Sequence, residues 1–125
     1  MDKIKNYIIN AVELRVGNHV INKHGKEDVV TSVGAGFCST KKAGVNLISE
    51  ISQVPLTVMW LKNYGFKKTD INELTVEYGK GNFYLKVFDN EVISLVCSDT
   101  VFQIVFNSVH KLQNTYYELT NTILK

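Results

Sequence analysis

Four uncharged polar side chains gather in the last stretch of the chain that has helical periodicity. His110, Asn114 and Tyr117 stand at positions i, i+4 and i+7, and Gln113 lies beside them. Residues at these spacings share one face of an α-helix. Such a face offers hydrogen-bond donors and acceptors without formal charge, so it could bind a polar ligand, a peptide or a second copy of the chain. The alternative is that these side chains cap neighbouring loops and satisfy backbone groups.

Lysines in the first half of the chain form a second candidate site. They could line one edge of a small sheet and contact the phosphates of a nucleic acid. The four residues are Lys23, Lys26, Lys41 and Lys42. The aromatic platform that such sheets use is thin here, because only Phe37 is close by. The formal net charge of +2 is a mild bias, and Arg15 is the only arginine, so nucleic-acid binding is the secondary hypothesis.

Patterns for catalysis or metal binding are missing from the sequence. His19 and His24 lie across one predicted turn, but no pair of cysteines stands at short spacing and no helix carries His-x-x-x-His. Cys38 and Cys97 lack a helix-entry or glycine-elbow context, so we expect two buried free thiols. The run Gly34–Gly36 lacks the Gly-Lys-Ser/Thr ending of a phosphate loop. The sequence therefore predicts a protein that is not an enzyme, with no metal and no cofactor.

The element that must position the polar cluster is the longest predicted helix. Asn107 or Ser108 is expected to cap it, and Asn121 to end it. Apolar residues recur along it at spacings of three and four, so they share a face that packs on a sheet or on a partner. These residues are Val109, Leu112, Tyr116, Leu119 and Ile123.

Four short strands are expected in the first half of the chain, joined by polar turns. Gly25 is free to take a positive φ in the first of these turns. The predicted strands are His19–Asn22, Asp28–Val33, Phe37–Thr40 and Val45–Ile48. Together they indicate a small curled antiparallel sheet whose opening resembles that of SH3-like barrels.

The second half predicts a short helix and a β-meander. The helix spans Val58–Tyr64 and is closed by Gly65, and Lys67–Asn72 is interpreted as a polar connection. Alternating or apolar runs then predict three strands joined by short turns. They are Leu74–Tyr78, Phe83–Val87 and Val92–Cys97. Val101–Phe106 either extends this sheet or leads into the last helix, and the fold class is α+β.

The length of 125 residues and the apolar fraction of 45% indicate one domain, residues 1–125, with one hydrophobic core. Met1–Asn10 carries charge without a sustained apolar run, so we interpret it as an arm or an initial strand and not as a signal peptide. No segment approaches the roughly 20 apolar residues of a membrane span. The expected location is the cytoplasm, with no membrane partner.

Three stretches carry a resemblance to a known family. Glu13–Asn18 reads ELRVGN, Val54–Leu61 reads VPLTVMWL with Gly65-Phe66 after it, and Val109–Thr120 reads VHKLQNTYYELT. Their order and spacing resemble a family of small uncharacterised proteins from Bacteroidetes and their phages and prophages. Those proteins end the last motif with glycine, where this chain has Asn121. The resemblance implies a phage or prophage origin and a bacterial cytoplasm, and it carries over no catalytic residues.

The leading hypothesis from the sequence is therefore a non-enzymatic binding protein that acts inside the infected cell. Its ligand is either a host protein or a nucleotide signal of host defence that it sequesters. The last helix could also make a homo-oligomer contact. An enclosed polar pocket in a stable oligomer would favour the nucleotide signal, and an exposed apolar patch on a monomer would favour a protein. The alternatives are a nucleic-acid-binding accessory protein and a virion or assembly component.

Overall fold

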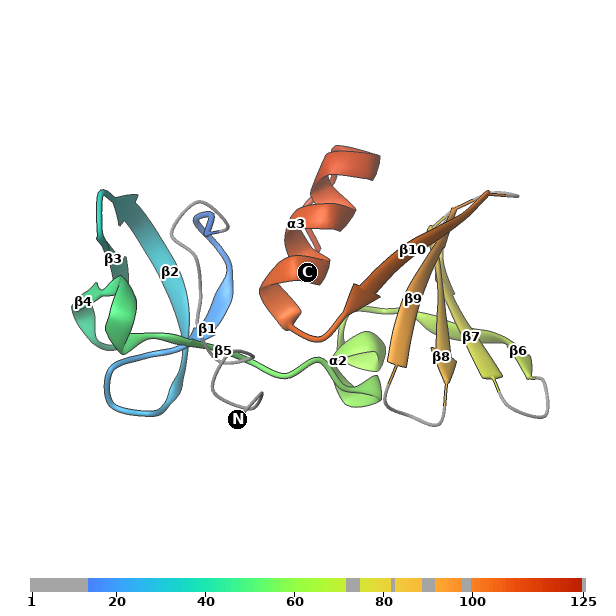
Figure 1. The fold of residues 1–125 in the computed structure, drawn as a ribbon, viewed down its shortest axis with the longest axis horizontal. Coiled ribbons are helices and arrows are strands. Elements are labelled where there is room, and N and C mark those ends of the chain that lie inside the picture. The colour runs from blue at the N-terminus through green and yellow to red at the C-terminus, as the bar shows by residue number, and fades with distance from the viewer. Residues whose placement is uncertain (1–13, 72–74, 82, 89–91, 98–99, 125) are drawn as a thin grey trace.

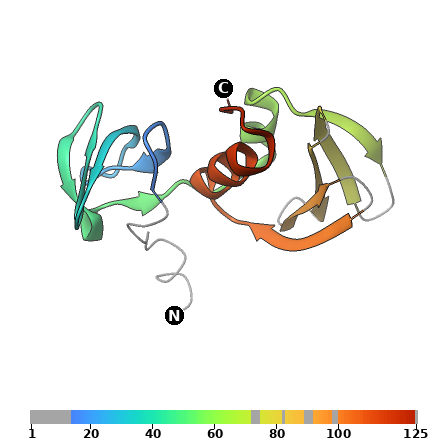
Figure 2. The same ribbon diagram turned by 90° about the horizontal axis from the view of Figure 1, so that it is seen from above.

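The computed structural model describes residues 14–71, 75–81, 83–88, 92–97 and 100–124. The predicted arm Met1–Asn10 and the predicted turn Asp89-Asn90 lie outside these residues. The fold is α+β, as expected from the sequence, and contains two five-stranded sheets. The C-terminal helix lies between the two sheets in both ribbon views (Figures 1 and 2).

The first sheet is small, antiparallel and curled, with strand order β4-β3-β2-β1-β5. A single 3-10 turn, η2, precedes its last strand, which returns to pair with β1. This arrangement confirms the small curled antiparallel sheet expected from the sequence. The elements are β1 His19–Ile21, β2 Glu27–Gly34, β3 Phe37–Thr40, β4 Gly44–Leu47, η2 Ile48–Glu50 and β5 Ser52–Gln53. Neither η2 nor β5 is among the predicted elements, because two or three residues are too few to show a periodicity.

Turn chemistry and alternation explain why these residues form strands. Gly25 has φ 76° in the β1–β2 turn and Gly36 has φ 78° in the β2–β3 turn, a region that favours glycine. Every second side chain then points inward, so Val20, Val30 and Cys38 are buried under the curled sheet.

The second sheet is a meander in which each strand pairs with the next, in the order β10-β9-β8-β7-β6. A short helix, α2 Val58–Asn63, comes before it. The strands are β6 Lys67–Ile71, β7 Thr75–Lys80, β8 Phe83–Phe88, β9 Val92–Cys97 and β10 Thr100–Phe106. Thr100–Phe106 pairs with β9, so it extends the sheet.

One prediction in this region is wrong. Lys67–Asn72 was expected to be a polar connection, but Lys67–Ile71 is strand β6, which pairs with β7. It is an edge strand, and Lys67, Lys68 and Thr69 on it are exposed. Charged residues are common on edge strands because they discourage pairing with other chains, so a polar composition did not exclude a strand here.

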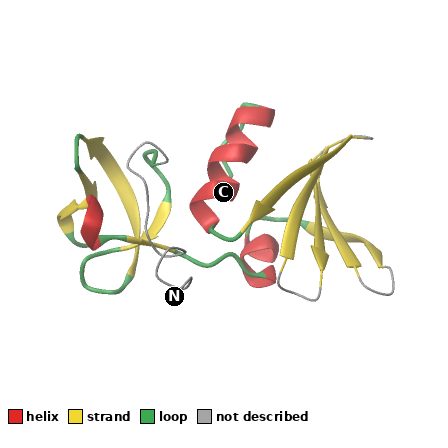
Figure 3. Ribbon diagram, in the orientation of Figure 1, coloured by secondary structure: helices red, strands yellow, loops and turns green. Residues whose placement is uncertain are grey.

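The last helix, α3, spans Val109–Thr120. Ser108 is the N-cap residue, and Asn121 ends the helix in the left-handed conformation at φ 57°. Both boundaries match the expectation. Figure 3 shows α3 and α2 beside the strands of the second sheet. Of the predicted apolar stripe, the part nearest the N-terminus of the helix is buried, whereas Leu119 and Ile123 are exposed.

Among the described residues, buried apolar side chains form two clusters, where one core was expected. The smaller cluster lies under the first sheet and includes Leu14, Val20, Val30, Cys38 and Ile51. The larger cluster joins the second sheet to both helices and includes Phe66, Phe83 and Tyr116, whose ring centres lie 5.0–6.2 Å apart. The residues named in the smaller cluster all lie outside α2 and α3.

The segment between the sheets is tied to the start of α3 by the main chain. The Val109 N–H donates to the Val54 carbonyl at 2.9 Å, and the Leu56 N–H donates to the Asn107 carbonyl at 3.1 Å. These two bonds hold the N-terminus of α3 beside the exit of the first sheet. The helix is thereby directed along the face of β1 and the turn that precedes it.

Candidate functional site

The polar face of α3 contacts the turn that leads into β1. Gln113 spans this contact, because its Oε1 accepts from the His19 N–H at 2.9 Å and its Nε2 donates to the Gly17 carbonyl at 2.9 Å. Next to it, Asn18 Nδ2 donates to Asn114 Oδ1 at 2.8 Å. The amide side chains of α3 therefore attach one half of the molecule to the other.

A tight turn over Arg15–Asn18 presents these groups to the helix. The Arg15 N–H donates to Asn18 Oδ1 at 2.8 Å, and the Asn18 N–H donates to the Arg15 carbonyl at 3.1 Å. Gly17 has φ 93°, which a side chain would strain, and its N–H donates to the Val30 carbonyl of β2. The turn is thus fixed both internally and against the first sheet.

A pocket of about 160 Å³ lies between this turn and the C-terminal half of α3. Its lining residues are Arg15, Val16, Gly17, Asn18, Gln113, Asn114, Tyr117, Ile123 and Leu124. The amides of Asn18 and Gln113 bond to the protein itself, so they offer little to a ligand. The rim includes exposed apolar and aromatic side chains, since Val16 is 67%, Ile123 64% and Tyr117 41% exposed. We call this feature the junction pocket.

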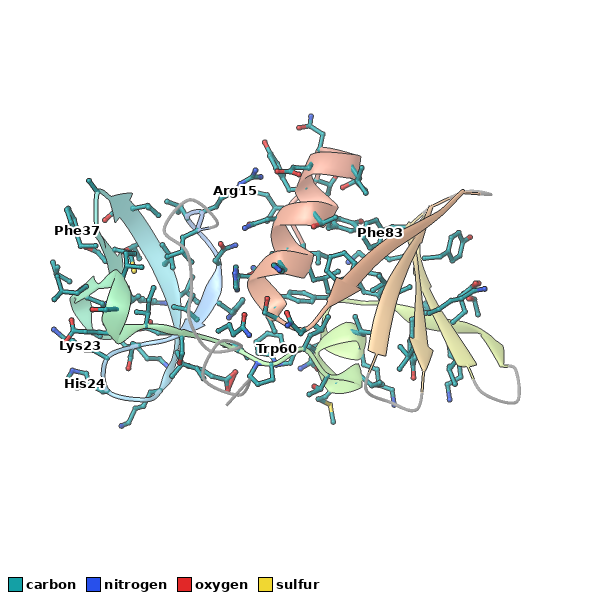
Figure 4. All side chains as sticks on the ribbon, viewed as in Figure 1. Arg15, Lys23, His24, Phe37, Trp60 and Phe83 are labelled. Carbon is teal, nitrogen blue, oxygen red and sulfur yellow. The ribbon has the colours of Figure 1, made fainter. Side chains whose placement is uncertain are left out.

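Arg15 is the only charged residue among those that line the junction pocket. Its Nη2 lies 2.5 Å from Glu118 Oε1, and its guanidinium carbon lies 5.9 Å from the centre of the Tyr117 ring. Figure 4 shows the Arg15 side chain extending from the first half of the molecule toward α3. The rim of the pocket therefore combines a cation, an aromatic ring and aliphatic side chains.

Three of the four residues predicted on α3 line this pocket, namely Gln113, Asn114 and Tyr117. His110 is fully buried in the first turn of the helix and does not line it. Gln113 follows the alternative given above, in which these side chains satisfy backbone groups. It bonds to the main chain of the neighbouring turn.

The opposite wall of the pocket was not predicted as a site. Arg15, Val16 and Asn18 belong to the first motif of the family resemblance, and Gln113 and Asn114 to the last. Residues separated by 95 and 96 positions therefore meet through hydrogen bonds. The joint presence of the two motifs was the signal in the sequence that could have identified this wall.

The four predicted lysines lie on two neighbouring turns at one end of the first sheet. Lys23 and Lys26 belong to the β1–β2 turn, and Lys41 and Lys42 to the β3–β4 turn. The Lys23 N–H donates to Asn46 Oδ1 at 3.0 Å, which links the first turn to β4. We call this group the lysine end. Phe37 lies away from Lys23 and His24, at the other end of β3 (Figure 4).

Asp28 holds the two turns together from a buried position. Its carboxylate accepts from Asn22 Nδ2 at 3.0 Å and from the main-chain N–H groups of Val29 at 2.8 Å and Lys42 at 3.0 Å. Burial acts to raise the pKa of Asp28, but the hydrogen bonds from Asn22, Thr40 and the backbone outweigh it and hold that pKa well below its ordinary value. The carboxylate is therefore a structural anion that is ionised at neutral pH.

The described cysteine thiol and the potential metal ligands show no reactive arrangement. Cys38 is a buried free thiol, as expected, and the side chain of Cys97 lies outside the described residues. Burial raises the pKa of Cys38, and the negative charge of Asp28 raises it further, so the thiol stays protonated. Within the described ranges, no three His, Cys, Asp or Glu side chains gather where they could hold a metal ion. No described helix has the length and apolar character to cross a bilayer.

The His19 ring packs against aromatic rings of α2 and its C-terminal end. The ring is half-buried against Trp60, at 5.0 Å between ring centres, and lies 6.4 Å from Tyr64. Burial lowers the pKa of His19, and the charge of Glu27 partly opposes this effect. The imidazole is therefore held in its neutral form between the two halves.

Comparisons with models of protein families, with curated proteins and with solved structures each find no match for this chain. The site is therefore interpreted from its own geometry and chemistry.

Proposed function

We propose that this chain is a non-enzymatic binding protein, encoded by a phage or prophage, that captures a host protein in the bacterial cytoplasm through the junction pocket. The phage origin and the cytoplasm rest on the sequence resemblance. The observation that carries the binding site is the open pocket with Val16, Tyr117 and Ile123 exposed around it. Exposed apolar groups that surround a hollow are typical of protein-binding surfaces, in which tyrosine and arginine are enriched.

The size of the pocket favours a protein partner over a whole nucleotide. Sites for drug-sized small molecules enclose about 300–1,000 Å³, whereas the junction pocket measures about 160 Å³. An apolar cavity of about 150 Å³ accommodates one benzene molecule. The pocket therefore suits a single apolar or aromatic side chain that projects from a partner surface.

The test is to purify the tagged protein from a bacterial host and to analyse it by native mass spectrometry. The double variant Tyr117→Ala/Ile123→Ser removes two side chains of the pocket. Met59→Ser removes an equally exposed apolar side chain on α2 that does not line the pocket, so it is the matched control. We expect one co-purifying protein with the native chain and with the control, and its loss with the double variant.

Two results would contradict this proposal. Equal recovery of a partner by the native chain and the double variant would exclude the junction pocket as the binding site. A small molecule that is released on denaturation, with no protein bound, would support sequestration of a nucleotide signal instead. Melting temperatures of all variants should stay close to that of the native chain, because the replaced side chains are exposed.

A second candidate function is favoured by the lysine end. Lys23, Lys26, Lys41 and Lys42 are exposed on two turns that partly buried hydrogen bonds fix side by side. Such a rigid group of point charges could follow a phosphate backbone without reading its sequence. The protein would then be a nucleic-acid-binding accessory protein.

The salt dependence of binding tests this second function. Affinity for a labelled single-stranded DNA is measured by fluorescence anisotropy over a range of salt concentrations. Replacing the four lysines of the lysine end by glutamine should reduce the steepness of the plot of log K against log salt by roughly 3. Each of the four lost phosphate contacts removes about 0.7–0.9. The control variant neutralises the exposed lysines Lys62, Lys67, Lys68 and Lys111 instead. Equal slopes for the two variants would exclude the lysine end.

A further inference from the structure

The charge at the rim of the junction pocket defines the chemistry of its partner. Resting on the proposed binding function, we infer that the pocket receives an apolar side chain with a carboxylate next to it, and that Arg15 releases Glu118 to bind this carboxylate. The partner would thus present an acidic segment with one apolar anchor. Glu118 serves as an internal substitute for the partner's carboxylate in the free protein.

The cation lies directly at the pocket. Arg15 is the only arginine of the chain, and it is the only charged residue among those that line the pocket. An arginine fork carries five N–H donors and binds a carboxylate through two parallel hydrogen bonds. Glu118 occupies only Nη2 of the Arg15 guanidinium, at 2.5 Å. The pocket therefore presents a cation beside exposed apolar side chains to an approaching ligand.

Replacing Glu118 by a partner's carboxylate at Arg15 requires little free energy. The side chains of Arg15 and Glu118 are 43% and 60% exposed. An exposed ion pair contributes little stability, so its opening is a small obstacle. Arg15 keeps its position without Glu118, because its main-chain N–H bonds to Asn18 and its guanidinium lies over the Tyr117 ring. A partner that covers the pocket removes water from the new ion pair and strengthens it relative to the old one.

The amide groups of Asn18 and Gln113 are engaged with the protein itself. Asn18 Nδ2 donates to Asn114 Oδ1, and Gln113 Nε2 donates to the Gly17 carbonyl. Among the residues that line the pocket, Arg15 is the one that offers a positive charge to a carboxylate. The exposed aliphatic rim of Val16 and Ile123 leaves room for the apolar anchor beside it.

Two small probes that differ only in charge test the inference. N-acetyl-phenylalanine carries a free carboxylate next to its aromatic side chain, and N-acetyl-phenylalanine amide carries none. Each is titrated into the isotope-labelled native protein, and the amide signals of Gly17, Asn18 and Tyr117 are followed by NMR. At about −0.3 kcal/mol per non-hydrogen atom, ligands of roughly 15 such atoms bind at about millimolar concentrations. We expect both probes to shift these signals and the carboxylate probe to bind more tightly.

Variants separate the proposed exchange from general binding. Glu118→Gln should tighten binding of the carboxylate probe by about two- to five-fold, because it removes the competing ion pair. It should leave the amide probe unchanged. Arg15→Gln should abolish the difference between the two probes, and so should about 1 M salt, which shortens the screening length to about 3 Å. Lys111→Gln on the same helix is the control, since Lys111 does not line the pocket.

Equal affinity for the two probes, or weaker carboxylate binding by Glu118→Gln, would overturn the inference. Binding of neither probe would overturn it as well. None of these results bears on the purification test of the proposed function. A native partner that is lost with Tyr117→Ala/Ile123→Ser but retained by Arg15→Gln would keep the binding function and reject the role of Arg15.

Discussion

The two halves of the molecule reach a folded interior by different means. Among the described residues, the second sheet and the helices share a large apolar cluster built around aromatic rings, whereas the cluster under the first sheet is smaller. The first half instead buries Asn18, Asn22, Asp28, Thr40 and Asn46, which are joined to its turns by hydrogen bonds. A small sheet can therefore be ordered by a satisfied polar network where apolar area is scarce.

The largest expected effect is in the apolar half. Phe83→Ala should lower the free energy of unfolding by about 3–5 kcal/mol, because Phe83 is fully buried against Phe66 and Tyr116. Urea unfolding followed by Trp60 fluorescence and by circular dichroism measures the change. Lys86→Ala on the same strand is the control, since Lys86 is only half-buried. A loss below about 1 kcal/mol would show that the large cluster does not dominate this half.

The polar half should be most sensitive at Asp28. Asp28→Asn should cost about 2–3 kcal/mol, since hydrogen bonds to a charged group are replaced by weaker ones and some donors lose their acceptor. Because the pKa of Asp28 is lowered on folding, its contribution is present above about pH 4 and is lost as the pH falls through the folded-state pKa. Acid titration of stability measures this loss. If Asp28→Asn lost stability at low pH as the native chain does, Asp28 would not be the group responsible for that loss.

A smaller effect is expected where the halves meet. Gln113→Ala should cost about 1–2 kcal/mol, because the His19 N–H and the Gly17 carbonyl lose their partner. Hydrogen exchange of the His19 amide should accelerate more than that of Val20 in the core of the first sheet. Lys111→Ala, an exposed change on the same helix, should alter neither rate. Equal protection of His19 in both variants would show that Gln113 does not hold the junction.

The smallest effect concerns His19 itself. Its pKa is lowered on folding, so the unfolded chain binds more protons and the stability should decline as the pH falls below about 6.5. The decline is modest because the ring is half-buried. Melting temperatures between about pH 7.5 and about pH 5 measure it, and His19→Gln should flatten that part of the profile. A profile that His19→Gln leaves unaltered would place the effect on another group.

The elements that the sequence predicted well are those that local rules determine. The alternation of Phe83, Leu85 and Val87 marked β8, and Gly25 and Asn121 marked a turn and a helix end. Strand β6 was missed because an edge strand tolerates a run of mostly polar residues. Strand β5 was missed because only its pairing with β1 makes two residues a strand.

One wall of the candidate site could be predicted from the sequence and the other could not. Helical spacing grouped Gln113, Asn114 and Tyr117, since residues on one helix face follow from the sequence alone. The other wall of the junction pocket depends on a contact across 95 positions, which no local periodicity contains. Helical spacing also grouped His110 with them, and only the packing of α3 shows that this side chain is buried.

The long-range origin of the junction pocket has a consequence for synthesis on the ribosome. The residues of the first sheet emerge early, whereas Gln113 and Tyr117 emerge near the end of translation. In a nascent chain halted before α3, the Gly17 carbonyl and the His19 N–H would lack the Gln113 side chain that bonds them. Such a chain would have no pocket, so the ability to bind would be acquired only in the last steps of elongation.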